Sequence, residues 1–126
     1  MERRVREVSL HQDVEARYLS ICQNDPETAD LIAQAVDLLA AEGPSLGRPL
    51  VDRIKGSNYH NMKELRPASA GATEVRILFA FDPRREAIFL VAGDKSGNWE
   101  GWYREAVPLA DERYAEHLEA LEAGRR

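Results

Sequence analysis

Cysteine is nearly absent from this chain of 126 residues, in which Cys22 is the single example. One cysteine excludes an internal disulfide framework and a cysteine-rich metal site. The three histidines, His11, His60 and His117, have no metal-ligand spacing with one another or with Cys22. We therefore expect no metal and no other cofactor.

Long apolar runs are also missing. No run approaches the roughly 20 residues that a bilayer-crossing helix requires, and Arg3, Arg4 and Arg6 are followed by a mixed segment rather than the apolar core of a signal peptide. The chain has no serine-nucleophile motif, no phosphate-binding P-loop and no Gly-rich dinucleotide fingerprint. We expect a cytoplasmic protein without a membrane segment.

An excess of positive charge is lacking as well. The net charge is −5 and the pI is about 5.2, which argues against a generic nucleic-acid binder because such domains often have a pI above ~9. The distribution is uneven, since residues 51–104 carry a net charge of +2. Length and the absence of repeats or linkers predict one domain over residues 1–126.

Three strand-like runs form the predicted centre of the fold: Met62–Arg66, Thr73–Phe81 and Ala87–Ala92. The turn-forming segments Pro67–Ala72 and Asp82–Arg85 connect them and are short enough for antiparallel neighbours. The middle run alternates, so that one face receives Val75, Ile77, Phe79 and Phe81, and the other Arg76, Leu78 and Ala80. The pattern predicts a three-stranded meander.

Helical periodicity flanks this meander. Arg4–Leu10 is a plausible first strand, His11–Cys22 reads as a helix, and a second helix begins after the capping residue Asp25 and ends at Gly43. The segment Gly43–Asn58 reads as irregular, and Leu109–Leu121 as a final helix after Pro108. The order predicts an α+β fold, with a helical hairpin on a small antiparallel sheet and the first strand at an edge or beside the last strand.

Cations occur where a plain core sheet would not carry them. Arg66, Arg76 and Lys95 lie on or directly after the three central strands, and pairing of these strands in order would bring the three side chains together. Such a cluster suits a phosphate group, because guanidinium and ammonium groups donate to its oxygens. The alternatives are a solvated strand arginine, a structural pair of Arg66 with Glu64, and a turn lysine.

Proton acceptors and aromatic rings lie nearby in the sequence. Alternation puts Glu64 on the face of Arg66 and Lys63 on the face of Leu65, and His60 precedes this strand as a possible general acid or base. Candidates for stacking on unpaired bases follow Lys95; they are Trp99, Trp102 and Tyr103. The alternative is that these rings pack beneath the C-terminal helix.

The segments LGRPLVDRIKGSNYHNMKELRP and EVRILFAFDPRREAIFLVAGDKSGNWEGWYREAVPLAD resemble the HigB-like, phage-derived branch of the RelE/ParE toxin superfamily. The resemblance covers about Val5 to His117. It rests on the KELR motif at Lys63–Arg66, the strand Arg76–Phe81 and the strand ending Gly93–Lys95. It implies a helical hairpin on a twisted antiparallel sheet, in a toxin of a type II toxin–antitoxin module.

The resemblance also implies metal-independent, ribosome-dependent cleavage of mRNA by attack of a ribose 2′-hydroxyl on the adjacent phosphate. By position, Arg76 resembles the arginine that grips the phosphate, Lys95 the group that assists the leaving 5′-oxygen, and Arg66 the basic residue of the KELR strand. Tyr103 or Trp99 would hold the stacking place. Because Glu64 stands where RelE carries a lysine, the general base stays open among Glu64, His60 and Lys63.

The implied partners are the ribosome, its mRNA and a cognate antitoxin with a helix-turn-helix domain, through which the complex would bind operator DNA. Two rival functions remain at this point: a non-catalytic gyrase inhibitor like ParE, and a degenerate module that binds an antitoxin-like partner and does nothing else. The overall acidic charge and Glu64 favour the second rival, since phosphate contacts dominate affinity for RNA.

Overall fold

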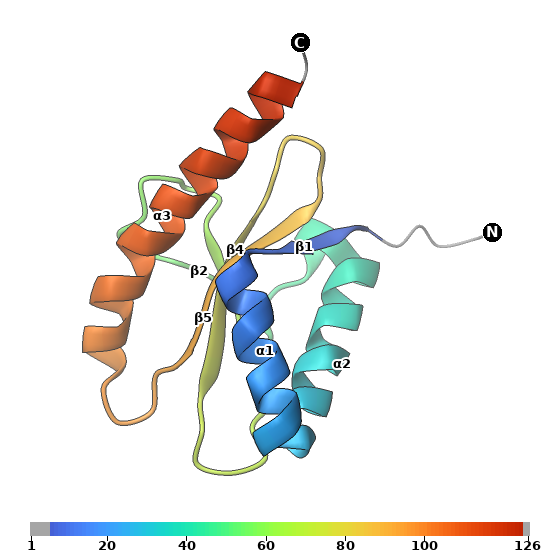
Figure 1. Cartoon of the computed structure of the whole chain (residues 1–126), viewed down its shortest axis with the longest axis vertical. Helices are drawn as coiled ribbons and strands as arrows, with labels where there is room; N and C mark the ends of the chain where they lie inside the picture. The colour runs from blue at the N-terminus through green and yellow to red at the C-terminus, as the bar shows by residue number, and fades with distance from the viewer. Residues whose placement is uncertain (1–5, 125–126) are drawn as a thin grey trace, which may run out of the picture.

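A computed structural model describes residues 6–124, so Arg4 and Val5 of the expected first strand lie outside the described residues. A five-stranded sheet separates two helical layers (Figure 1). Helices α1 (Gln12–Asn24) and α2 (Pro26–Glu42) cover one face, and α3 (Trp99–Gly124) covers the other. None of the described helices has the length and apolar character that crossing a membrane would need.

The sheet has the strand order β1-β5-β4-β3-β2. Its strands are β1 (Val8–Leu10), β2 (Val51–Arg53), β3 (Lys63–Leu65), β4 (Val75–Phe81) and β5 (Ala87–Asp94). The central meander β3-β4-β5 is antiparallel, as expected, and β1 lies beside the last strand at a sheet edge. The described part of the chain is α+β, as predicted.

Two features of the sheet correct the sequence expectation. The sheet is mixed rather than antiparallel, because β1 runs parallel to β5; no tight turn joins these two strands, so nothing local imposes an antiparallel pairing. The segment expected to be irregular contains β2, which pairs with β3. Three residues are too few to show alternation, and only the long-range pairing makes them a strand.

The helical hairpin forms where its capping residues predict. The carboxylate of Asp25 accepts a hydrogen bond from the Thr28 N–H at 3.3 Å, and Pro26 occupies the first turn of α2. Gly43 ends α2 with φ +67°, a conformation that favours glycine. A short 3-10 turn, η1 (Gly43–Ser45), leads away from the helix.

The C-terminal helix is longer than predicted. Its first residue is Trp99 rather than Leu109, and Pro108 lies inside it. Proline removes one helical hydrogen bond, but Ala106, Val107 and Ala110 on the adjacent turns are buried against the sheet. Packing on the sheet outweighs the local preference, with the consequence that Trp99, Trp102 and Tyr103 are helical residues.

The sheet has an apolar cluster on each face. The predicted alternation of β4 is confirmed, since Val75, Ile77 and Phe79 join the cluster under the hairpin, and Leu78 and Ala80 join the one under α3. A register shift between β4 and β5 lets the consecutive residues Leu90 and Val91 both join the α3 side. The helical hairpin and α3 therefore each pack on their own apolar cluster, one on either face of the sheet.

Candidate functional site

The cations predicted to converge lie on the α3 side of the sheet, around Tyr103. The phenol of Tyr103 donates a short hydrogen bond to Glu64 Oε2, and Lys95 Nζ lies 5.7 Å from the centre of the Tyr103 ring. Burial, followed by the hydrogen bond to Glu64, raises the pKa of Tyr103 well above its usual value, against the opposing charges of Arg76 and Arg66. Tyr103 is therefore a neutral donor near pH 7.

The side chain of Glu64 lies at the centre of this cluster and is buried, with 1% of it exposed. Its second oxygen, Oε1, accepts a hydrogen bond from Arg66 Nε at 2.7 Å. Arg66 also reaches Asp52 on β2, with 3.3 Å between Nη2 and Oδ2. Because both carboxylate oxygens have donors, Glu64 orients Arg66 and Tyr103 rather than presenting an unoccupied base.

Arg76 differs from Arg66 in having no carboxylate partner among the described residues. Its Nη1 donates to the carbonyl oxygen of Val75 at 2.8 Å, while its Nε is buried and has no acceptor within residues 6–124. The side chain is half-buried. A cation with unused donors in such a setting can bind an anion.

Lys95 lies next to this cluster at the end of β5. Its ammonium group is 4.0 Å from Glu74 Oε2, a weak and partly exposed contact, and 19% of the side chain remains accessible. Lys95 therefore has only this weak contact and its position over the Tyr103 ring to hold it, so its ammonium group can turn toward a ligand. An exposed ion pair of this kind contributes little to stability.

The two tryptophans of α3 occupy different environments. Trp102 packs against Gly93 so closely that a side chain at that position would overlap the indole ring. Trp99 is 57% exposed, and its ring meets Tyr103 edge-on at 6.4 Å between centroids. Exposure therefore makes Trp99, rather than Trp102, the aromatic surface beside Lys95 that is open to a ligand.

Two of the predicted site residues lie away from this cluster. Lys63 is on the hairpin side, where its Nζ donates to the carbonyl oxygen of Pro44 at 3.4 Å and burial lowers its pKa. His60 is exposed in the turn before β3 and takes part in none of the hydrogen bonds that Tyr103, Arg66 and Arg76 make within residues 6–124. Alternation in the sequence predicted this separation for Lys63.

The sequence did not predict that Glu64 also binds Tyr103, or that Arg66 also binds Asp52. Tyr103 is 39 positions from Glu64, and Asp52 lies in a segment that was read as irregular. No local signal in the sequence connects these residues. Within residues 6–124, no three His, Cys, Asp or Glu side chains gather as a metal site would require.

The sequence of this chain is similar to those of known proteins. A family model described as "Phage derived protein Gp49-like" matches residues 21–115. The chain is 57% identical over 98 residues to "Putative toxin HigB2" of Mycobacterium tuberculosis (strain ATCC 25618 / H37Rv), a match that covers 78% of this chain and 49% of that protein. The chain thus spans about half the length of that relative.

A second relative is "Putative toxin HigB3" of the same organism, which is 54% identical over 93 residues, covering 74% of this chain and 79% of the relative. No solved structure matches the chain. Both relatives carry the same type of name, and the family match covers every residue of the cluster described above, from Asp52 to Tyr103.

Proposed function

We propose, from the premise that the chain belongs to the Gp49-like family of phage-derived proteins and to its HigB-like toxins, that this protein is the toxin of a type II toxin–antitoxin module. The expected family is confirmed by these matches. In this proposal the protein cleaves mRNA on the ribosome in the cytoplasm, without a metal, and a cognate antitoxin with a helix-turn-helix domain holds it inactive.

The observation that carries the proposal is the state of Arg76. Its guanidinium group has a buried Nε without an acceptor and no carboxylate partner among the described residues, and it lies on the same face as Lys95 and Trp99. A scissile phosphate would accept hydrogen bonds from Arg76. The developing negative charge would then be stabilised by a group that is already in place.

In the proposed reaction, a ribose 2′-hydroxyl attacks the adjacent phosphorus as a base removes its proton. The bond from phosphorus to the 5′-oxygen breaks, that oxygen takes up a proton, and a cyclic 2′,3′-phosphate remains. Lys95 would assist the leaving oxygen, Arg66 would add positive charge from its anchored position, and Trp99 would stack on a base. The proposal assigns the base to none of the three residues that the sequence suggested. Glu64 already accepts hydrogen bonds from Tyr103 and Arg66, Lys63 lies on the hairpin side of the sheet, and His60 lies in the turn before β3, away from the cluster.

An Arg76→Ala variant tests this role directly. Loss of the guanidinium group removes transition-state stabilisation, so we expect mRNA cleavage to slow by about 100-fold or more. Induction of the wild-type protein in bacteria should arrest growth and shorten transcripts, whereas the variant should do neither. Arg84→Ala is the matched control, because Arg84 is exposed in the turn between β4 and β5 and belongs to no part of the cluster.

A second candidate function is binding without catalysis, as a gyrase inhibitor or as a module for an antitoxin-like partner. It is favoured by the ion pairs that already engage Arg66 and Lys95 and by the net charge of −5. Intact transcripts together with an inhibited gyrase would support the gyrase inhibitor. Unchanged growth, intact transcripts and active gyrase would support the binding module, and each result would overturn the ribonuclease proposal.

A further inference from the structure

The edge of the sheet at β2 is rich in positive charge, although the whole chain has a net charge of −5. Strand β2 is the last strand in the sheet order and lies beside β3. From residue 48 to residue 66, which spans both strands, the chain has five Lys and Arg side chains and two carboxylates. This segment therefore carries a net charge of +3, and the two faces of the edge share that charge unequally.

On the α3 side of this edge, cations and carboxylates balance. The strand register places Asp52 of β2 opposite Glu64 of β3, and Arg66 contacts both carboxylates. Arg48 Nε lies 3.6 Å from Asp52 Oδ1. Two arginines therefore meet two carboxylates on this side, and little positive charge is left without a partner.

On the hairpin side, two cations lie directly opposite each other. The register pairs Arg53 of β2 with Lys63 of β3, and opposed like charges destabilise a strand pair. Within residues 6–124, no Asp or Glu forms an ion pair with either side chain. Lys63 Nζ has the carbonyl oxygen of Pro44 at 3.4 Å and the centre of the Phe81 ring at 5.7 Å. Burial, followed by the charge of Arg53, lowers the pKa of Lys63, so the described fold does not compensate this pair.

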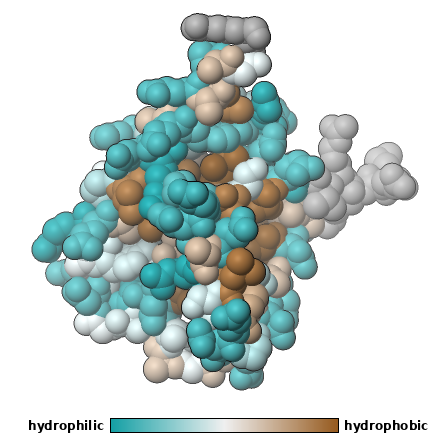
Figure 2. All heavy atoms as spheres, viewed as in Figure 1, coloured by the Kyte–Doolittle hydropathy of each residue, from teal (hydrophilic) through white to brown (hydrophobic). Residues whose placement is uncertain are grey.

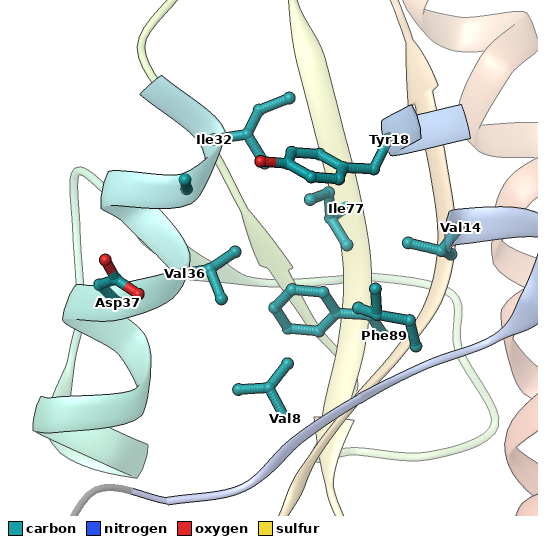
Figure 3. Close-up of a pocket in the computed structure, with 10 residues that line it drawn as sticks. Val8, Val14, Tyr18, Ile32, Val36, Asp37, Ile77 and Phe89 are labelled. Carbon is teal, nitrogen blue, oxygen red and sulfur yellow. The ribbon is translucent and has the colours of Figure 1, made fainter. Parts of the chain in front are cut away.

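The cavity on the hairpin side has a different character. It has a volume of about 280 Å³, its floor includes Ile77 and Phe89, and α2 forms one wall (Figure 3). Among the described residues that line it, Asp37 is the charged one, and Figure 2 shows apolar surface beside the helical hairpin. On this side of the sheet, an anion is therefore attracted to Arg53 and Lys63 rather than to the cavity.

We propose that Arg53 and Lys63 bind a phosphate group of the substrate RNA strand outside the scissile linkage. Guanidinium and ammonium groups donate to phosphate oxygens, so a phosphate between them would replace one repulsion with two attractive contacts. Arg66 of the candidate site contacts Asp52, the neighbour of Arg53 in β2, and an RNA strand that leaves Arg66 around the β2 edge arrives at the pair. The choice of RNA rests on the proposed function, whereas the uncompensated charge does not.

Binding of a single-stranded 2′-O-methyl RNA of about twelve nucleotides tests the inference, because the methyl groups block cleavage and leave the phosphates unchanged. Arg53→Gln and Lys63→Gln each remove one charge and keep most of the side chain. We expect about threefold weaker binding or more at low salt in each variant, about tenfold or more in the double variant, and a salt slope of log affinity that is shallower by about 0.7 per lost contact. Arg17→Gln is the matched control and should bind as the wild type does, because Arg17 is exposed on α1, which packs on β5, three strands away from β2.

Acetylation of the wild-type protein gives a second readout that does not depend on how the variants fold. The lysines of the chain are Lys55, Lys63 and Lys95. Bound RNA should slow the acetylation of Lys63 as well as that of Lys95, as measured by mass spectrometry. Protection of Lys95 without Lys63 would show that the RNA does not reach the β2 edge, and would overturn the inference. Poly-L-glutamate that binds as tightly as the RNA, and loses the same affinity in the Gln variants, would overturn it in favour of an acidic protein partner.

Thermal unfolding separates this role from a structural one. Removal of one of two opposed like charges relieves repulsion, so Arg53→Gln should unfold at the wild-type temperature or above it. A lower unfolding temperature together with wild-type RNA affinity would make Arg53 structural and overturn the inference. Gln variants that lose RNA affinity, in a protein that leaves growth and mRNA unchanged, would retain this inference and lose the proposed function. Wild-type mRNA cleavage with unchanged oligonucleotide affinity in the Gln variants would do the reverse, also where ribosome binding is lost.

Discussion

The two faces of the sheet are held in different ways. Under the hairpin, the cluster consists of apolar residues, and Thr28 is the buried polar residue among the described parts of α1 and α2. Under α3, three carboxylates are buried as well: Glu64, Asp82 and Asp111. Each accepts hydrogen bonds, and each is joined to α3 or belongs to it.

The partners of these carboxylates show what α3 does. Tyr103 donates to Glu64 near the start of the helix, and Asp111 in the middle accepts bonds from Ser57 and from the backbone N–H of Asn58. Toward the end of the helix, His117 Nε2 lies 2.9 Å from Asp82 Oδ2. Buried hydrogen bonds are directional, so these carboxylates add a fixed register to the apolar packing of α3. The face that bears the candidate site is therefore held by specific polar bonds as well as by apolar contacts.

The largest effect that we expect comes from the apolar face. Phe89→Ala removes a ring that is fully buried beneath the hairpin and packs against Phe79 at 5.7 Å between centroids. The free energy of unfolding should fall by about 3–5 kcal/mol. Urea denaturation of the variant and the wild type would measure this. Leu19→Ala, at an exposed position of α1, is the control and should cost little; an equal loss in both would contradict the comparison.

A smaller loss is expected on the polar face. Glu64→Ala deprives Tyr103 and Arg66 of a charged acceptor, which should cost about 3 kcal/mol at most. Glu64→Gln keeps the shape but offers one acceptor oxygen where two donors point, so it should also destabilise. Where the proposed function holds, both variants should also lose RNA cleavage, because Arg66 is no longer held in place by Glu64. A Gln variant as stable as the wild type would show that the carboxylate charge is dispensable for holding α3.

The sequence predicted the apolar face better than the polar one, for a physical reason. Alternation along β4 assigns Val75 and Ile77 to one face from adjacent residues alone, and the structure confirms it. The hydrogen bond between Tyr103 and Glu64 depends instead on where α3 begins. That start was predicted at Leu109, because a proline inside a helix removes a hydrogen bond, whereas α3 in fact begins at Trp99 and contains Pro108. Strand β2, and with it Asp52, was missed because three residues carry no periodicity.

In the candidate site, too, part of the arrangement could be predicted from the sequence and part could not. Convergence of Arg66, Arg76 and Lys95 followed from the order of the strands, and the structure places all three on the α3 side near Tyr103. The pair of Arg66 with Glu64, which the sequence left as an alternative, is present. The further contacts of Arg66 with Asp52 and of Lys95 with Glu74 were not predicted, because both carboxylates come from outside the KELR strand. The roles assigned to these residues in catalysis stay predictions.

The smallest expected effect is a change in alkaline stability. The pKa of Tyr103 is raised, first by burial and then by the hydrogen bond to Glu64, so folded Tyr103 holds its proton more tightly than in the unfolded chain. Its contribution to stability is therefore complete below about pH 10 and is lost as the pH rises above that value. The positive charges of Arg76 and Arg66 oppose part of the shift, and Lys95 Nζ lies over the ring of Tyr103.

Tyr103→Phe removes the titrating hydroxyl and keeps the ring. We expect a loss of about 1–2 kcal/mol at neutral pH, because Glu64 loses one donor, and a shallower fall in stability above about pH 10 than in the wild type. Tyr114→Phe is the internal comparison, since burial raises the pKa of Tyr114 too, but far from Glu64 and without a carboxylate acceptor for its hydroxyl. Urea titrations at several alkaline pH values measure the slopes. Equal slopes for Tyr103→Phe and the wild type would mean that the phenol ionises alike in both states, and that Glu64 does not hold α3 through it.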